Sequence, residues 1–259
     1  MSAWDPGHAA AFFDGYGEKE WTRFERRTGS SSLATHLHYL RRFVRAGDRV
    51  LDAGAGPGRF TLELLRLGAD VTALDISPGQ LELLRERAPD VDAQIGDITD
   101  LSVFPGDAFD ATVCFGGPLS YVLDRAEDAV AELARVTRPG GRLLVSAMAT
   151  IGATLTVAGG VAALVEAYGE ETVRHVMQTG LLSSSLSNGH LDMRMYRARE
   201  LQALLEPHGT VVAASATGIF LADNPAPADL LAELELDLGA EPGALDLGNH
   251  ILLVLAVGT

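Results

Sequence analysis

The chain has 259 residues, a formal net charge of −15 at pH 7 and one cysteine. This length suits one large α/β domain, and a lone cysteine excludes a framework of internal disulfides. The negative charge would repel a phosphate backbone, so we expect no nucleic-acid partner. No basic-then-apolar leader opens the sequence, and no uncharged apolar run reaches about 18 residues. We therefore expect a cytoplasmic protein that does not enter a membrane.

The basic residues are few and unevenly placed. Lys19 is the only lysine, which excludes a Walker A lysine, a Schiff-base lysine and a Tyr-x-x-x-Lys dyad from the body of the fold. Arginines gather before Arg49, and no lysine or arginine follows Arg199. This asymmetry indicates a solvated basic face opposite an acidic one, or a basic rim that attracts an anionic substrate.

Residues 1–48 show the pattern of a short helix, a glycine-flanked turn and a second helix. Phe12 and Phe13 precede the turn, Tyr16 stands between Gly15 and Gly17, and Trp21 lies in the expected second helix. Trp21 either encloses a ligand or packs its helix against the rest of the chain.

A glycine-rich loop follows the first predicted strand. An apolar run ends at Asp52, glycines stand at 54, 56 and 58, and residues 61–65 have helical spacing. The pattern predicts a strand, a tight loop and a helix. Glycines let a ligand approach the backbone, and a helix N-terminus offers free N–H groups, so we expect a flat or polar ligand here.

The strands that follow end in acidic residues. A dinucleotide site of the G-x-G-x-x-G type would need its last glycine where Arg59 stands, so a nicotinamide or flavin site is the alternative. The strand 70–75 ends in Asp75, about 20 residues beyond the loop, where a carboxylate can bind both ribose hydroxyls of an adenosine. Ser77 is a predicted helix cap, and Asp97 follows the third strand. Each aspartate alone also suits a turn or cap.

Two further strands complete this half. Residues 109–115 form a strand that opens into Gly116 and Gly117, and residues 126–136 form a helix. A turn at residues 138–141 then leads to the strand 142–148. Cys114, at the end of a buried strand, is expected to be a small core residue.

From about Arg49 to Met148 these motifs resemble the class I, Rossmann-like family of S-adenosylmethionine (SAM) dependent methyltransferases. The resemblance implies a doubly wound α/β fold, whose mostly parallel seven-stranded sheet carries helices on both faces. It also implies SAM as methyl donor, S-adenosylhomocysteine as product and no metal. The cofactor-binding residues that it implies are Asp52, Gly54, Ala55, Gly56, Gly58, Asp75, Ile76, Gly96, Asp97, Ile98, Phe115 and Gly116.

The resemblance also suggests how the remaining segments are used. Residues 1–48 would form a helical flap in which Tyr16 helps to enclose the methionine end of SAM. Residues 49–259 would form the SAM-binding core, with a lid at about 149–208 and a smaller insertion at about 224–247. In the lid we expect a broken helix over 161–177, a serine-rich loop over 182–188 and a helix over 198–206. In the smaller insertion we expect an amphipathic helix whose apolar face carries Leu230, Leu231, Leu234 and Leu238, before a last strand over 250–257.

Methyl transfer from a sulfonium is an in-line displacement that needs alignment rather than a metal. Gly117 stands where amine-methylating relatives place an Asn or Asp before Pro-Pro and an aromatic, so we favour an oxygen acceptor on a small molecule over nitrogen or carbon. Tyr16 and His190 are the candidate catalytic residues, His190 as a base for a hydroxyl or as a structural histidine. Arg194 and Tyr196 alternate with His190, as on one face of a strand, and are candidate substrate contacts.

Two alternatives stay open at this point. A tRNA wobble-uridine carboxyl methyltransferase would share these motifs but should carry a basic surface. A nicotinamide-dependent reductase would need a pair of hydride-transfer acids that the sequence does not show. The acceptor and the oligomeric state are undetermined by the sequence.

Overall fold

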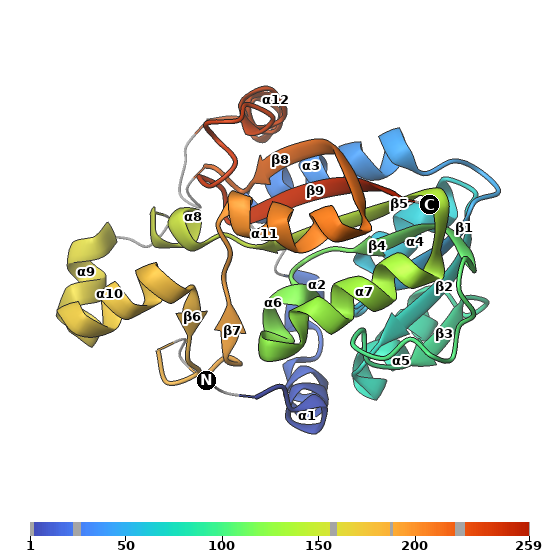
Figure 1. Cartoon of the computed structure of the whole chain (residues 1–259), viewed down its shortest axis with the longest axis horizontal. Helices are drawn as coiled ribbons and strands as arrows, with labels where there is room; N and C mark the ends of the chain where they lie inside the picture. The colour runs from blue at the N-terminus through green and yellow to red at the C-terminus, as the bar shows by residue number, and fades with distance from the viewer. Residues whose placement is uncertain (1–2, 23–26, 156–159, 187–188, 221–225, 259) are drawn as a thin grey trace.

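The computed structural model describes residues 3–22, 27–155, 160–186, 189–220 and 226–258. Within them a seven-stranded sheet runs in the order β3-β2-β1-β4-β5-β9-β8 (Figure 1). β9 is antiparallel to both of its neighbours, and all other adjacent pairs are parallel, which confirms the predicted doubly wound α/β fold. The strands are β1 (Arg49–Ala53), β2 (Asp70–Asp75), β3 (Asp92–Ile95), β4 (Phe109–Cys114), β5 (Thr137–Met148), β8 (Gly209–Thr217) and β9 (His250–Val257).

Helices cover both faces of the sheet because successive strand residues alternate between two hydrophobic cores. Leu143 belongs to one core and Leu144 to the other. The first core includes side chains of α7 and α11, and the second includes side chains of α3 and α4, while α5 packs on β2 and β3. These helices are α3 (Arg27–Phe43), α4 (Arg59–Arg66), α5 (Pro78–Arg87), α7 (Ala126–Val136) and α11 (Ala198–Leu205).

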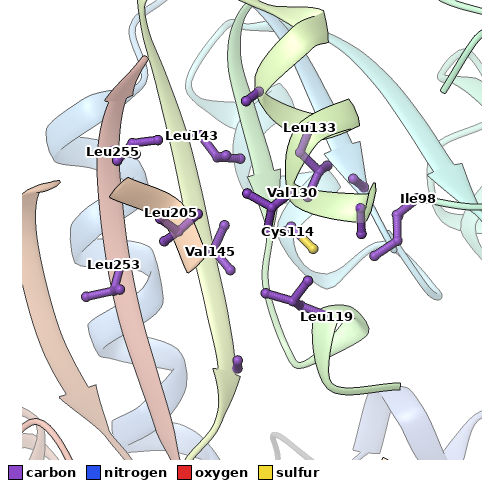
Figure 2. Close-up of a cluster of buried hydrophobic side chains, with 14 of the residues drawn as sticks. Ile98, Cys114, Leu119, Val130, Leu133, Leu143, Val145, Leu205, Leu253 and Leu255 are labelled. Atoms are coloured by element: carbon purple, nitrogen blue, oxygen red, sulfur yellow. The ribbon is translucent and has the colours of Figure 1, made fainter. Parts of the chain in front are cut away.

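Cys114 lies in the first core, as predicted. Its side chain points toward Leu119 and Val130 (Figure 2) and is fully buried. Burial raises the pKa of its thiol to about 12, with a smaller contribution from the nearby carboxylate of Asp52. A thiol held neutral in this way is inert, so Cys114 fills space.

Local signals place several helix ends correctly. The side chain of Ser77 accepts a hydrogen bond from the backbone N–H of Gln80 at 3.1 Å, and Pro78 occupies the first helical position of α5. The cap predicted from sequence is confirmed, and a proline at the first helical position is typical of a helix start.

The start of β5 differs from the prediction. The expected turn at residues 138–141 is a bulged part of the strand, because Phe109 pairs with Thr137 and Ala111 pairs with Arg142. The extra residues on β5 are accommodated by Gly140, whose φ is +73°, and by Arg138, whose Nε donates to Asp110 at 2.7 Å.

The segment before the sheet divides into two parts. The helices α1 (Pro6–Tyr16) and α2 (Lys19–Thr22) stand apart from the sheet, and residues 23–26 of the predicted second helix lie outside the described residues. By contrast, α3 is a core helix, since Tyr39 and Leu40 are buried against the sheet. We therefore restrict the proposed flap to α1 and α2 instead of residues 1–48.

The predicted lid also divides. The broken helix is present as α9 (Gly160–Tyr168) and α10 (Glu170–Thr179), separated at Gly169 with φ +84°. A helix that was not predicted, α8 (Thr150–Leu155), precedes them, and a hairpin of β6 (Leu181–Leu182) and β7 (Met193–Arg194) follows. Because α11 buries Leu201 and Leu205 in the first core, the proposed lid ends before it rather than at residue 208. Short helices complete the chain: α6 (Pro118–Tyr121), η1 (Leu123–Arg125) and η2 (Glu206–His208).

The predicted apolar face of the last helix, α12 (Ala228–Gly239), is wrong. Leu231 is buried there, but Leu230, Leu234 and Leu238 are 44%, 37% and 47% exposed. The buried face is centred instead on Glu235, whose carboxylate accepts hydrogen bonds from Ser31, Thr35 and the backbone N–H groups of residues 218 and 219. Periodicity assigns leucines to the core by default, but a fully bonded carboxylate can replace them.

No helix within the described part of the chain is long and apolar enough to cross a bilayer.

Candidate active site

A pocket opens at the carboxyl ends of β1, β2, β3 and β4 and encloses about 690 Å³, its open mouth included. Open α/β sheets bind ligands at this edge. Nine of the residues predicted to bind a cofactor line it: Gly54, Gly56, Asp75, Ile76, Gly96, Asp97, Ile98, Phe115 and Gly116. The topology thus brings together side chains that the sequence separates by more than 60 residues.

The glycines after β1 have different uses. All three have positive φ, at +81° for Gly54, +54° for Gly56 and +95° for Gly58. A Cβ at Gly54 would lie 2.3 Å from Cγ of Pro118, and one at Gly58 would lie 2.3 Å from Cδ1 of Leu84. These two glycines permit close packing against α6 and α5, whereas a Cβ at Gly56, which lines the pocket, would make only an ordinary contact of 3.7 Å with Cγ of Glu20.

Asp75 presents a carboxylate at the end of β2. One oxygen accepts a hydrogen bond from the N–H of Gly56 at 2.7 Å, and the other accepts one from the N–H of Ser77 at 2.9 Å. Burial raises the pKa of this carboxyl to about 6, although both hydrogen bonds act to lower it. Asp75 is thus ionised near neutral pH and fixed at the wall of the pocket.

Asp52 lies beneath the loop rather than in the pocket lining. Its carboxylate accepts a hydrogen bond from Thr61 Oγ1 at 2.6 Å, and burial raises its pKa to about 7. Ala55 and Gly58 are also outside the lining, and the N–H groups of Gly54 and Ala55 donate to the carbonyl of Leu74 at 2.7 and 3.0 Å. We infer that Asp52, Ala55 and Gly58 shape the loop rather than touch its ligand.

Asp97 is already engaged by the N-terminal segment. Its carboxylate accepts hydrogen bonds from the indole N–H of Trp4 at 2.7 Å and from the backbone N–H of Thr99 at 2.8 Å. Trp4 lines the pocket as well, although no sequence motif pointed to it. A carboxylate has lone pairs for more than two donors, so Asp97 can hold Trp4 and still accept from a ligand.

The loop after β4 is held from behind by a chain of hydrogen bonds. The N–H of Gly116 donates to Ser146 Oγ at 2.9 Å, and that hydroxyl lies 3.0 Å from Nε2 of His36. Nδ1 of His36 lies 2.7 Å from the carbonyl of Ser32, so Nδ1 carries a proton. With Gly116 donating to Ser146, the serine proton points to Nε2. His36 is a positioning residue for Gly116, and no pattern in the sequence indicated this role.

Gly117 follows with φ +103° and directs the chain into α6. It is outside the pocket lining, and a Cβ built on it would lie 3.8 Å from Nε2 of His250 and 3.9 Å from the ring of Tyr121. Its proposed contact with substrate therefore stays a prediction.

His190 joins an aromatic cluster between the lid and α1. Its ring centroid lies 4.7 Å from Phe12, 5.6 Å from Tyr121 and 5.9 Å from Tyr16, and it stacks on Tyr121. The backbone N–H of Leu191 donates to Nδ1 at 2.9 Å, so the neutral ring carries its proton on Nε2. That tautomer can donate from Nε2 but cannot accept a proton there, which favours a packing role over a base.

Tyr16 belongs to the same cluster and is outside the pocket lining. It ends α1 and stacks on Phe12 at 5.6 Å, with Nζ of Lys19 5.9 Å from its ring. In this arrangement it links the flap to the lid, and its proposed roles in catalysis and cofactor binding stay predictions.

Arg194 and Tyr196 do not extend a strand face that begins at His190, because β7 contains only Met193 and Arg194. Tyr196 is buried in the first core, where its hydroxyl approaches the carbonyl of Leu119 at 3.5 Å. Burial raises its pKa to about 12. The shared face was wrong, and the predicted contact of Tyr196 with substrate is replaced by packing. Arg194 is half-buried, with its guanidinium 5.0 Å from the ring of Tyr196.

Eight residues that line the pocket were not assigned to it from the sequence. They belong to the flap, the start of α5 and the segment after β4: Trp4, Ala9, Phe13, Glu20, Gln80, Pro118, Tyr121 and Val122. Two signals were visible in the sequence: the aromatic content of residues 12–16 and the position of Pro118 in the loop after β4. The places of Trp4, Ala9 and Glu20 depend on how the N-terminal segment docks.

α1 docks on the start of α5 through polar contacts. Asp14 accepts hydrogen bonds from Ser77 Oγ at 2.6 Å and from the N–H of Gly79 at 2.8 Å. Gln80 Nε2 donates to the carbonyls of Phe13 and Gly17 at 2.9 and 3.1 Å. The flap is therefore tied to the element that follows Asp75.

Trp21 of α2 is outside the pocket lining, although Glu20 of the same helix is part of it. The ring of Trp21 lies between two guanidinium groups, 3.5 Å from that of Arg59 and 4.4 Å from that of Arg87. Its carbonyl also accepts from Arg59 at 2.7 Å. Of the two interpretations offered for Trp21, the structure favours packing.

A family described as a methyltransferase domain matches residues 50–141, which contain the glycine loop and most of the pocket wall. Residues 50–141 are thus similar to a methyltransferase domain, in agreement with the class I SAM-dependent family that the motifs resemble. The motifs that carried the resemblance in the sequence are those that build this pocket.

Two relatives with named activities are similar to this chain over about half of its length or less. A demethylmenaquinone methyltransferase of Renibacterium salmoninarum is 37% identical over 54% of this chain and 59% of its own length. A malonyl-[acyl-carrier protein] O-methyltransferase of Serratia marcescens is 40% identical over 40% of this chain and 39% of its own length. The chain thus spans about half the length of these curated relatives.

Solved structures share the fold over most or all of this chain. A SAM-dependent methyltransferase from Mesorhizobium loti has a TM-score of 0.58 and 22% identity, covering 83% of this chain and 94% of its own. The 1,6-didemethyltoxoflavin-N1-methyltransferase of Burkholderia thailandensis has a TM-score of 0.56 and 18% identity, covering 100% and 93%. At such identities the likeness establishes the architecture alone.

Proposed function

We propose that this protein transfers a methyl group from SAM to a small-molecule acceptor, with oxygen of a hydroxyl or carboxyl group as the favoured target. The observation that carries the proposal is the position of Asp75, a buried carboxylate at the pocket wall beside the glycine loop. The match of residues 50–141 to a methyltransferase domain favours methyl transfer over the nicotinamide-dependent chemistry that the sequence alone left open.

The residues present fit SAM. A carboxylate held by two backbone N–H groups suits a pair of ribose hydroxyls, and Asp97 with the backbone around it suits an adenine amino group. Ile76 and Ile98 supply apolar surface from two neighbouring strand ends. The backbone at Gly56, which lines the pocket without a side chain, suits the chain that joins the ribose to the sulfonium.

The protein's contribution to such a reaction is alignment. The sulfonium of bound SAM supplies an electrophilic methyl group. Asp75 and Asp97 fix the nucleoside, and the segment Phe115–Gly116, held by Ser146 and His36, forms a rigid wall on the acceptor side. The rings of Phe13 and Tyr121 pack against each other, with their centroids 5.5 Å apart, and exclude water from the space next to this wall. Alignment of this kind is worth roughly 7 to 11 kcal/mol of the barrier.

Oxygen is favoured because the loop after β4 offers Gly116-Gly117-Pro118 in place of the polar grip on an amine. Of the two relatives described, one is named for demethylmenaquinone and the other for O-methylation of malonyl-[acyl-carrier protein]. Both names concern acceptors other than nucleic acid, which agrees with the net charge of −15.

Calorimetric titration with S-adenosylhomocysteine tests the proposal most directly. We expect binding by the wild type and a loss of about 10- to 150-fold in affinity for Asp75→Ala, the scale of hydrogen bonds to a charged group. Asp70→Ala is the matched control, because Asp70 is exposed at the other end of β2, and it should bind as the wild type does.

Equal affinity in Asp75→Ala would remove the ribose assignment, and tight binding of NADH by the wild type would overturn the class. Release of S-adenosylhomocysteine in a screen of hydroxyl and carboxyl compounds identifies the acceptor. Salt-dependent tRNA binding at micromolar concentration would contradict the small-molecule proposal.

A further inference from the structure

A second pocket lies inside the lid and is separate from the site at the glycine loop. It is enclosed by α8, α9, α10 and the β6–β7 hairpin and holds about 840 Å³, its open mouth included. None of the described residues that line it is charged, although 21% of the chain is. Its apolar wall is formed chiefly by Leu164, Val173, Val176, Met177, Leu186 and Met195.

The few polar groups on this wall do not change its character. Thr154 Oγ1 donates to the carbonyl of Thr150 at 2.9 Å and lies 3.1 Å from the sulfur of Met177, so its hydrogen bonds are made inside the protein. Tyr168 and Thr172 are hydroxyl-bearing and uncharged. An ionised ligand would find no charged partner on the described wall, whereas an alkyl or aromatic group would find dispersion contacts.

The lid around the pocket is itself incompletely packed. Of the residues in α10, only Val173 is buried, and none of the described residues of α9 is. Leu155 and Val161, close to the pocket in sequence, are 55% and 52% exposed. Apolar side chains left around an open space cost stability, so their presence points to an occupant.

The hairpin places this pocket next to the proposed acceptor side. β6 contacts α10, while β7 contacts α6, whose Pro118 and Tyr121 line the first pocket. Figure 1 shows β6 and β7 standing between α10 and α6. Leu182 and Met195, at the two ends of this hairpin region, line the lid pocket. A molecule that reaches past the hairpin would contact both.

We propose that the lid pocket binds an uncharged alkyl or aromatic arm of the methyl acceptor, while the group to be methylated lies at the segment after β4. The proposal rests on the proposed function and names its substrate class: a small molecule with a polar, methylatable end and an apolar arm.

The test uses an uncharged fluorescent compound, N-phenyl-1-naphthylamine, and its displacement by alkyl esters of 4-hydroxybenzoic acid, from methyl to octyl. For the wild type saturated with S-adenosylhomocysteine, we expect affinity to rise with chain length, by up to about fourfold for each methylene group that becomes buried.

Two variants alter the pocket in different ways, and each has a control on the same helix. Val176→Asp adds a charge to the wall, and Gln178→Asp adds the same charge at an exposed position of α10. Ala153→Phe fills the space, and Leu155→Phe adds bulk at an exposed position of α8. We expect each pocket variant to lose at least tenfold in affinity for the octyl ester, with unchanged affinity for S-adenosylhomocysteine showing that it is folded. Both controls should behave as the wild type.

A chain-length dependence that persists unchanged in both pocket variants would overturn the proposal, as would its absence from the wild type. A wild-type dimer that binds no dye and dissociates in Val176→Asp would overturn it too, because a second copy would then cover the pocket. Chain-length dependence without any binding of S-adenosylhomocysteine would overturn the proposed function and still support an apolar ligand site in the lid.

Discussion

The glycine-loop pocket and the lid are built on different principles. In the pocket, ligand-facing groups are fixed by backbone hydrogen bonds and by glycines that admit no Cβ, as with Asp75 and Gly54. In the lid, contacts are made by half-buried side chains and ring stacking, as with His190, and an apolar space is left open. A site specified by backbone geometry tolerates little change, whereas one specified by side-chain surface can adapt to different acceptors.

The most direct test of this comparison replaces one glycine of each region by alanine. Gly54→Ala should lose about 3 to 5 kcal/mol, summed over the free energy of unfolding and the free energy of S-adenosylhomocysteine binding. The loss arises because the backbone has a positive φ here and because the new Cβ would collide with Pro118. Gly189 in the lid also has positive φ, at +79°, but a Cβ there would meet nothing within 4 Å. Gly189→Ala should leave that affinity unchanged in the same titration. Equal losses would mean that the two regions are not distinct.

A pH titration of stability tests the buried acid beneath the loop. The folded state raises the pKa of Asp52 from 3.8 to about 7, so it holds a proton that the unfolded chain has released. The free energy of unfolding therefore falls as pH rises from about 4 to about 7, by up to about 4 kcal/mol for this group. Asp52→Asn should flatten the fall in urea unfolding at several pH values. Asp75 lowers the free energy of unfolding in the same direction up to about pH 6, in the wild type and in Asp52→Asn alike. Parallel curves of unfolding free energy against pH for the two proteins would therefore contradict the raised pKa of Asp52.

The third test concerns the support of the acceptor-side wall. His36→Ala removes the partner of Ser146 and leaves a space in the core, and should lower the free energy of unfolding by about 2 to 4 kcal/mol. His38→Ala, two residues along on the same helix, should cost less than about 1 kcal/mol, because His38 is exposed. If the two variants unfold at the same urea concentration, the chain from His36 to Gly116 is not important for stability.

The smallest expected effect separates packing from proton transfer at His190. If His190 is a packing residue between α1 and α6, the His190→Ala variant should have about tenfold lower turnover, on the scale of two lost aromatic contacts. The His190→Phe variant should regain most of that turnover. A base would lose roughly 10²- to 10⁴-fold in both variants, with partial recovery at high pH. The pH profiles of the two variants therefore distinguish the roles, while binding of S-adenosylhomocysteine serves as the control for folding.

Local sequence signals predict most of the strands and the ligand edge of the sheet, while the seven-stranded sheet itself was implied by the family resemblance. Apolar runs of strand length, Ser77 as a cap and acids at successive strand ends are all local, and parallel strands bring their carboxyl ends together whatever lies elsewhere. The strand pattern alone therefore assigns Asp75 and Asp97 to one edge of the sheet.

Which side chains touch one another depends on tertiary packing. Glu235 occupies a core position in place of the leucines because donors from α3 and from the backbone just after β8 converge on it, and the donors on α3 lie far from it in sequence. His36 supports Gly116, and Trp4 binds Asp97, for the same reason. Such contacts depend on how helices dock, which periodicity does not encode, and the lid pocket exists only because α8, α9 and α10 leave a space when they meet the hairpin.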